Sequence, residues 1–296
     1  METFVSIIFF QLILKHKMMT KKIITIIICF YAVTTATAQQ QLDVSYMECS
    51  YMLTYMKDTV EKTKKVKDSD LRLLIGNKYS KFYSHATFIS DSVFFSLSNA
   101  EQNALFDNNS KGSVELSKKY PRGEGYQIYK NYEANTIELT ELIPIGGYVL
   151  CKEPLQNHNW NILNEMKQIA GYKCQKATCR FRGRDYIAWF TRDIPINEGP
   201  YKFSGLPGLI VKIYDTKEHY DFELYMVRKV SQPIIFKSFE KVQASPYREV
   251  SLKDYITLKK NFLKNIVAIT NLTITENGVT YTPPSLQYEP IELDVK

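Results

Sequence analysis

The residues with the most evident chemical potential are the charged side chains between positions 180 and 202. Asp193, Glu198 and Lys202 follow one another along this segment. Four arginines stand close to them in sequence: Arg180, Arg182, Arg184 and Arg192. A Glu and an Asp in one cleft can act as a general acid and base. The same carboxylates can instead be solvated, or accept hydrogen bonds from arginines that support the loop. We favour this second interpretation and assign no catalytic residue.

Short motifs that bind cofactors or activate nucleophiles are missing from the sequence. It contains no Gly-x-Ser-x-Gly elbow, no phosphate-binding loop and no dinucleotide fingerprint. It also lacks a CxxC pair and an HExxH motif, and its last three histidines, His85, His158 and His219, are scattered along the chain. We therefore expect neither a cofactor nor a metal site.

The charged segment runs into the stretch "KFSGLPGLIVKIYD" at residues 202–215. Leu206-Pro207-Gly208-Leu209 fits a type II turn, because Pro presets φ at the second position and Gly supplies a positive φ at the third. The connection 193–209 is rich in Pro and Gly, yet it also carries aromatic and leucine side chains that favour burial. We expect an ordered loop folded over one end of a sheet, with Leu206 buried beneath it rather than displayed to a partner.

Alternating apolar and polar residues indicate the elements that must position this loop. Strands are expected over 49–59 and 71–83, joined by a charged turn, and then over 125–142 as a hairpin and 147–154. Two or three more are expected within 160–194, followed by strands over 209–215 and 219–230. Residues 84–110 could hold a helix, 251–268 predicts one that begins with a capping box at Ser251 and Asp254, and Asn277-Gly278 predicts a hairpin turn. The fold class is α+β, mainly antiparallel β, with a curved, half-barrel-like sheet and one or two packed helices.

The first 38 residues have the pattern of a signal peptide with an upstream extension. Lys21 and Lys22 precede an apolar run over 23–33, which closes on a small-x-small site at 36–38. A lipoprotein signal at Cys29 is disfavoured, because Ile28 stands where a small residue is needed. We expect 1–38 to be removed and 39–296 to form a single β-rich domain, exported to the periplasm or the outer membrane and cell surface. The apolar run is too short to span a membrane.

Charge excludes one class of partner. Of the formal net charge of +7, +3 comes from the first 38 residues, which hold four lysines and one glutamate. In the rest of the chain the basic side chains are mixed with acidic ones, without a basic stripe interleaved with aromatics. Nucleic acid is therefore not an expected partner.

Four cysteines follow the predicted signal peptide: Cys49, Cys151, Cys174 and Cys179. An even number in an exported chain favours disulfides. A Cys174–Cys179 bridge is disfavoured, because five residues of strand place the two about 16 Å apart on opposite faces. We expect at least one disulfide, with Cys151 as the first candidate, since its strand can lie beside the strand of Cys174.

Several short motifs carry a resemblance to a known family. They are "GYKCQKA" at 171–177, "FRGR" at 181–184, "AWF" at 188–190, "GPYKF" at 199–203 and "GLPGLI" at 205–210. Together they resemble the GLPGLI family of bacterial envelope proteins, which has no assigned activity, so the resemblance implies location and kinship without a reaction. The general layout is also similar to lipoprotein carriers, in which a curved sheet wraps around helices. The family motif falls on Gly199, Pro200, Tyr201, Lys202, Phe203, Gly205, Leu206, Pro207, Gly208, Leu209 and Ile210.

The function expected from these observations is non-catalytic binding in the envelope, of an apolar or amphipathic ligand or of a protein partner, near the 193–209 loop. The alternatives are an envelope hydrolase that uses the loop carboxylates and a structural surface component. Two further stretches, 58–60 and 91–93, resemble the Asp-Ser/Thr-aliphatic acceptor sites of a bacterial O-glycosylation system, with Thr59 and Ser92 as the acceptors.

Overall fold

A computed structural model describes residues 40–56, 65–106, 115–116, 118–143, 146–236, 247–265, 274–276, 279–281 and 289–293. The chain divides into two units, Met1–Gln40 and Gln41–Lys296, and the fold given below is that of the second. The predicted signal peptide, Thr59 and the predicted Asn277-Gly278 turn lie outside the described residues.

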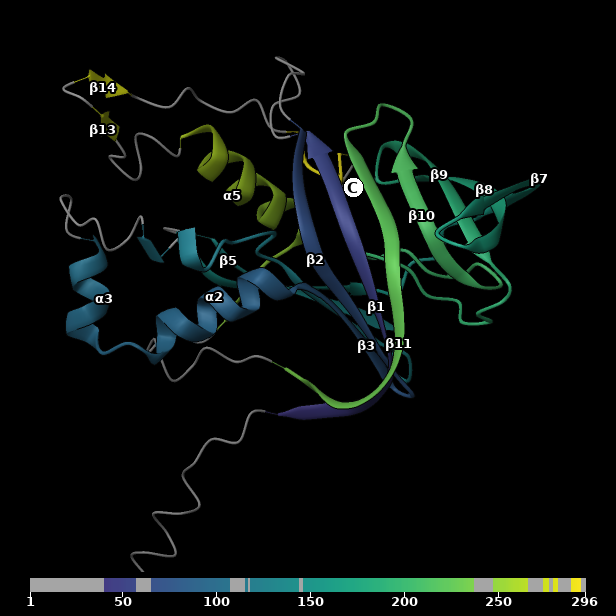
Figure 1. The fold of residues 1–296 in the computed structure, drawn as a ribbon, viewed down its shortest axis with the longest axis horizontal. Helices are drawn as coiled ribbons and strands as arrows, with labels where there is room; N and C mark the ends of the chain where they lie inside the picture. The colour runs from purple at the N-terminus through teal and green to yellow at the C-terminus, as the bar shows by residue number, and fades with distance from the viewer. Residues whose placement is uncertain are drawn as a thin grey trace, which may run out of the picture. The chain divides into compact units, whose positions relative to one another are not determined.

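One large sheet dominates the second unit (Figure 1). Its strands are β1 (Gln41–Met56), β2 (Lys65–Gly76), β3 (Tyr79–Ser84), β4 (Gln127–Asn131), β5 (Thr136–Ile143), β6 (Gly147–Pro154), β7 (Asn161–Ile169), β8 (Tyr172–Phe181), β9 (Arg184–Thr191), β10 (Leu209–Asp215), β11 (Tyr220–Ile235) and β12 (Arg248–Glu249). The order of the twelve strands is β12-β6-β5-β4-β3-β2-β1-β11-β10-β9-β8-β7. All described neighbours are antiparallel except β12 and β6. This open, mainly antiparallel sheet with few helices confirms the predicted fold class.

Side-chain alternation explains why these segments form strands with one buried face. In β11, Tyr220, Phe222 and Leu224 are buried, whereas Asp221 and Glu223 between them are partly exposed. This is the pattern of an antiparallel strand with one face on the core.

The predicted strand over 71–83 is interrupted, and this is a correction. Residues 65–76 form β2 and 79–84 form β3, with a tight turn between them. The carboxylate of Asp43 accepts hydrogen bonds from the backbone N–H groups of Lys78 and Tyr79, at 2.6 and 3.1 Å. Residues 65–70, which were predicted to belong to the charged turn, are part of β2, and 57–64 lie outside the described residues.

Helices α2 (His85–Ser96) and α3 (Asn99–Phe106) occupy the stretch for which a helix was considered, and α5 (Leu252–Lys264) is the helix predicted from its capping box. The Ser251 hydroxyl accepts a hydrogen bond from the Asp254 N–H at 3.1 Å, as an N-cap does. Helix α2 contacts β2 and β3, whereas α5 contacts β5 and β6. A separate hairpin pairs β13 (Ile274–Glu276) with β14 (Val279–Tyr281). Among the described residues, no helix combines the length and apolarity needed to cross a membrane.

All four described cysteines are buried and free, so the expected disulfide at Cys151 is not formed in the structure. The two strands expected to lie side by side are not neighbours: β6, which holds Cys151, pairs with β5 and β12, whereas β8, which holds Cys174 and Cys179, pairs with β7 and β9. Cys151 faces Leu139, and Cys49 faces Leu73 and Val227. Burial raises the pKa of the Cys151 thiol to about 11, so it is protonated at neutral pH and packs as a small apolar side chain.

Candidate functional site

The connection 193–209 is an ordered loop that its own backbone closes. The N–H of Leu209 donates to the carbonyl of Ile194 at 3.0 Å, and the N–H of Ile210 donates to that of Glu198 at 3.0 Å. An isolated bridge also joins Glu198 to Ser204. The expected ordered loop is therefore confirmed.

Aromatic and leucine side chains of this loop fill the space beneath it. Phe203 is fully buried and its ring lies 4.7 Å from that of Tyr186 and 5.3 Å from that of Phe181, centroid to centroid. Leu206 is 1% exposed, so the interpretation that favoured its burial is correct. The side chains of the loop itself, rather than an open apolar cavity, occupy this position.

The Pro-Gly turn differs from the predicted type II turn. The N–H of Gly208 donates to the carbonyl of Leu206 at 2.8 Å, which encloses Pro207 in a three-residue turn. Gly208 has φ of 158°, close to extended backbone rather than the value near +80° of a type II turn. Glycine is needed here for another reason, since a Cβ on Gly208 would lie 2.0 Å from the carbonyl oxygen of Thr191.

The charged side chains singled out in the loop divide between the surface and the interior. Asp193 is exposed, whereas Glu198 is buried. Glu198 accepts hydrogen bonds from the buried Lys130 ammonium at 2.7 Å and from the Tyr132 hydroxyl at 2.9 Å. Lys130 also donates to the carbonyl of Phe203 at 2.8 Å. Glu198 thus holds the loop in place, and the structure does not give Asp193 and Glu198 the shared surroundings of an acid–base pair.

Lys202, the second buried cation, lies at the centre of a larger ion-pair cluster. It is fully buried and pairs with Glu153 and, at 2.5 Å, with Glu292. Arg182 contacts the same two carboxylates, at 2.6 Å for Glu153 and 3.5 Å for Glu292. Burial lowers the pKa of Lys202, but Glu292 and Glu153 outweigh burial and raise it, so the ammonium stays charged.

Glu292 belongs to a short C-terminal stretch, Glu289–Leu293, which we call the tail segment. No local signal marks this segment, because "EPIEL" matches no motif and its partners lie about a hundred positions earlier in the chain. Tyr201 donates its hydroxyl hydrogen to Glu292 at 2.6 Å, and Ile291 is buried. Tyr201 has φ of 56°, an unusual conformation for a bulky residue. The motif residues Tyr201 and Lys202 thus both contact the tail segment.

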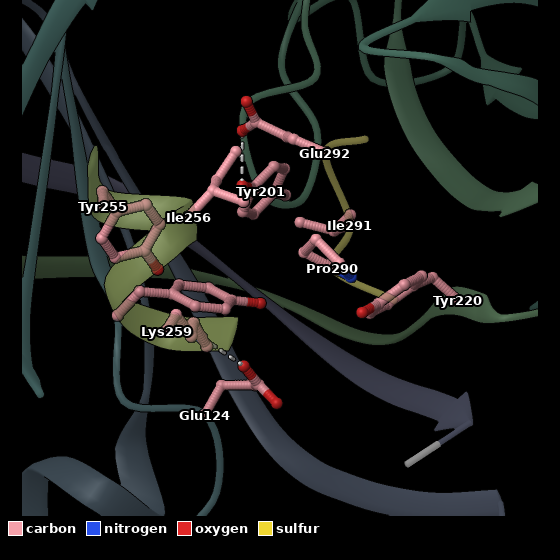
Figure 2. A pocket seen from close by; sticks show the side chains of 10 residues that line it. Glu124, Tyr201, Tyr220, Tyr255, Ile256, Lys259, Pro290, Ile291 and Glu292 are labelled. Atoms are coloured by element: carbon pink, nitrogen blue, oxygen red, sulfur yellow. Dashed lines mark hydrogen bonds and ion pairs between the residues drawn. The ribbon is translucent and has the colours of Figure 1, made fainter. Parts of the chain in front are cut away.

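A small pocket lies between α5 and the tail segment (Figure 2). Its lining residues are mostly tyrosines and charged groups: Glu124, Tyr126, Tyr201, Tyr220, Tyr255, Ile256, Lys259, Pro290, Ile291 and Glu292. Lys259 pairs with Glu141 at 3.2 Å and with Glu124 at 3.7 Å. Burial raises the pKa of Glu124. A volume of about 20 Å³ suits a water molecule rather than an organic ligand.

His158 is the least satisfied polar side chain near the loop. It is 3% exposed, and within the described part of the chain neither ring nitrogen has a hydrogen-bond partner. Its ring stacks on Trp160 and contacts Phe181 and Phe203. Burial lowers the pKa of His158 to about 3, so the imidazole is neutral at physiological pH.

The remaining candidates lie apart from this site or contribute to packing. Ser92 is exposed on α2, where its hydroxyl donates to the carbonyl of Phe88 at 2.7 Å, and its glycosylation stays a prediction. Gly199 allows close packing, since a Cβ there would lie 2.7 Å from Cδ1 of Ile210. Gly205 and Pro207 are the exposed members of the family motif. No cluster of His, Cys, Asp and Glu that could hold a metal is found among the described residues.

Comparison with known protein families gives a match over a short stretch of the chain. The model of a family described as "Protein of unknown function (Porph_ging)" matches residues 182–212. No curated protein matches the chain. Among solved structures, "Structure of PNGF-II in P21 space group" has a TM-score of 0.46 at 12% identity, and the C2 crystal form has 0.45 at 12%. Each alignment covers 79% of this chain but 35% of the solved chain, so this chain spans about a third of their length. The family model therefore singles out the segment that holds Arg182, Tyr201 and Lys202, and its description attaches no activity to it.

Proposed function

We propose that the protein is an exported, non-catalytic envelope protein of the GLPGLI type that binds another polypeptide along β7, beside the 193–209 loop. The observation that supports this most strongly is the state of β7. It is the last strand in the sheet order, and in the described part of the chain it pairs with β8 alone. An edge strand offers backbone N–H and C=O groups to which an extended peptide can add as a further strand.

The side chains of β7 make this edge attractive to a partner. Seven of its nine residues are exposed. They include two large apolar side chains, Ile162 at 40% exposure and Met166 at 47%. The strand contains no proline, which would block pairing. Apolar side chains on the edge strand of a sheet favour association with another chain.

The residue that precedes the edge strand contacts the 193–209 loop. Trp160 precedes β7 and donates its indole N–H to the carbonyl of Ser204 at 2.8 Å. Its ring lies 6.4 Å from that of Phe203, and Gly205 beside it is exposed. A polypeptide that pairs with β7 would therefore meet the exposed turn of the family motif at one end.

Contacts beneath the loop favour a polypeptide over an apolar small ligand. Phe203 and Leu206 fill that space, and the pocket by α5 has room for water. The likeness to lipoprotein carriers gains no support from the comparisons. The hydrolase alternative loses its candidate pair, because Glu198 is neutralised by Lys130 inside the protein while Asp193 is exposed.

Site-specific photo-crosslinking in the native host tests the proposal. A photoreactive residue in place of Asn164, exposed on β7, should give one discrete adduct with another polypeptide. The same residue in place of Lys260, exposed on α5, is the matched control and should give none. The double variant Ile162→Lys/Met166→Lys should abolish the adduct at position 164 with an unchanged melting temperature. Equal adducts at both positions, or an adduct that survives the double variant, would overturn the proposal.

Export is tested separately. Amino-terminal sequencing of protein isolated from the envelope should begin at Gln39 or close to it. A chain that retains Met18, or one that begins at a lipid-modified Cys29, would contradict the predicted cleavage.

A further inference from the structure

We propose that residues 182–212, which the family model matches, form a peptide-binding site that we call the clamp. Its ligand is the extended, apolar-acidic tail segment Glu289–Leu293, which would bind even when it is cut from the rest of the chain. Strand β7 takes no part in this binding, which depends on what Arg182, Arg184 and Lys202 recognise. The clamp would accept the same sequence from a detached peptide.

The first half of the tail segment is held by its backbone carbonyls. The hydroxyl of Tyr220 donates to the carbonyl of Glu289 at 2.8 Å. The guanidinium of Arg184 donates to the carbonyl of Pro290 from two nitrogens, Nη2 at 2.8 Å and Nε at 3.2 Å. These donors are side chains of the sheet, so the segment is bound without becoming a strand.

The second half continues the same arrangement. The hydroxyl of Tyr186 donates to the carbonyl of Ile291 at 3.1 Å. The N–H of Leu293 donates to the carbonyl of Arg182 at 2.8 Å. Three successive carbonyls and one N–H are therefore recognised by fixed groups, as in sites that bind an extended peptide.

One side chain of the tail segment supplies specificity. Glu292 is 1% exposed; it accepts a hydrogen bond from the Tyr201 hydroxyl at 2.6 Å and forms ion pairs with Lys202 at 2.5 Å and Arg182 at 3.5 Å. Glu289 is different, since its side chain is 40% exposed. The clamp should therefore demand an acidic side chain at position 292 and tolerate a neutral one at position 289.

The cations of the clamp have partners outside the tail segment. Arg184 pairs with Asp215 at 2.9 Å. Lys202 and Arg182 both pair with Glu153. Because these carboxylates hold the cations in position, the site is preorganised for the tail segment, and preorganisation lowers the entropic cost of binding.

The experiment uses the full chain with a protease site inserted between residues 285 and 286, outside the described residues. After cleavage, the tail fragment should stay bound during gel filtration. A labelled synthetic peptide of residues 287–296 should replace it saturably, while the circular dichroism of the folded domain is unchanged. A tail that leaves without labelled peptide binding in its place, or one that exchanges only when the domain unfolds, would overturn the clamp.

Competition with variant peptides tests the recognition itself. A peptide with Glu292→Gln should compete at least about 30-fold more weakly, because the buried Lys202 then loses one of its two carboxylate partners. The matched control, Glu289→Gln, should lose less than about fivefold, as expected for a partly exposed ion pair. Equal competition by the two peptides would refute the assigned role of Glu292. The Ile162→Lys/Met166→Lys protein should bind the peptide normally, which separates this outcome from that of the edge-strand proposal.

Discussion

Two neighbouring regions of this protein, the 193–209 loop and strand β7, differ both in sequence motif and in solvent exposure. The 193–209 loop carries the distinctive motif, but most of it is buried and two buried lysines, Lys130 and Lys202, hold it in place. Strand β7 carries no motif, but it is exposed along most of its length and stands at the end of the sheet. Trp160 connects the two through its hydrogen bond to Ser204.

The difference shows that a distinctive sequence need not be a displayed one. The motif is unusual because it must fit a glycine against backbone, bury a lysine among carboxylates and fill the space below with rings. Each of these tasks restricts residue type more than solvent exposure does. An exposed binding surface such as β7 can therefore lie beside the motif, while the buried side chains of the motif hold the loop in place.

Among the variants that test this contrast, Lys202→Met should have the largest effect on the free energy of unfolding. The variant removes a buried cation and leaves Arg182 as the remaining described cation that pairs with both Glu153 and Glu292, so the free energy of unfolding should fall by about 3–5 kcal/mol. Chemical denaturation measures it. Lys212→Met, at a half-buried lysine of β10 that pairs with Asp221 and Glu223, is the control and should cost about 0–1 kcal/mol. Similar losses in both variants would remove the distinction between the loop and an ordinary strand.

Leu206→Ala should have the next largest effect. Truncating a leucine that is 1% exposed leaves a cavity and should lower the free energy of unfolding by about 2–5 kcal/mol. Ile162→Ala on β7 is the matched aliphatic control and should change it by less than about 0.5 kcal/mol. An unchanged denaturation midpoint for Leu206→Ala would mean that the leucine is displayed and that the contrast between the two regions is reversed.

Gly208→Ala tests the close approach of two backbone segments. The added Cβ would collide with the carbonyl of Thr191, and the shift needed to relieve the collision should cost about 2–3 kcal/mol. Pro207→Ala next to it is exposed and should cost less than about 1 kcal/mol, mainly through the unfolded chain. Thermal unfolding of both variants decides the matter. A larger loss at Pro207 would contradict the steric explanation.

The smallest effect concerns pH and His158, which lies where the two regions meet. The folded protein keeps this imidazole neutral down to a pKa of about 3, whereas the unfolded chain protonates it near pH 6.5. Stability is therefore lost as the pH falls through this window, by about 2 kcal/mol at pH 5 relative to pH 7.5. His158→Phe should remove this dependence in denaturation curves, and His85→Phe should keep most of it. Parallel curves for the wild type and His158→Phe would show that the histidine is hydrated.

Sequence reasoning predicted those features that depend on local pattern. Alternation located most strands, the capping box located α5, and the apolar side chains of the loop predicted the burial of Leu206. These signals are local because side-chain direction repeats with a fixed period along a strand or helix.

Features that depend on distant partners could not be predicted. A lysine is usually exposed, so nothing local marks Lys202 as buried; its partners Glu153 and Glu292 come from distant parts of the chain. The need for glycine at position 208 was attributed to turn geometry, whereas the carbonyl of Thr191 causes it. Strand adjacency, which the Cys151 disulfide required, is likewise a property of the completed sheet.

The position of β1 has a consequence for how the chain reaches its native state. This first strand lies in the interior of the sheet between β2 and β11, and its Ser45 hydroxyl bonds to Gln232, 187 residues later (Figure 1). A ribosome that has completed the first half of the domain has therefore produced a strand that still lacks its neighbour on one side. Such non-local pairing slows folding, and it leaves an unpaired, aggregation-prone strand edge while synthesis continues. We expect the nascent chain to depend on a holding chaperone until β11 has been made, and ribosome-bound chains truncated before residue 220 should stay sensitive to protease.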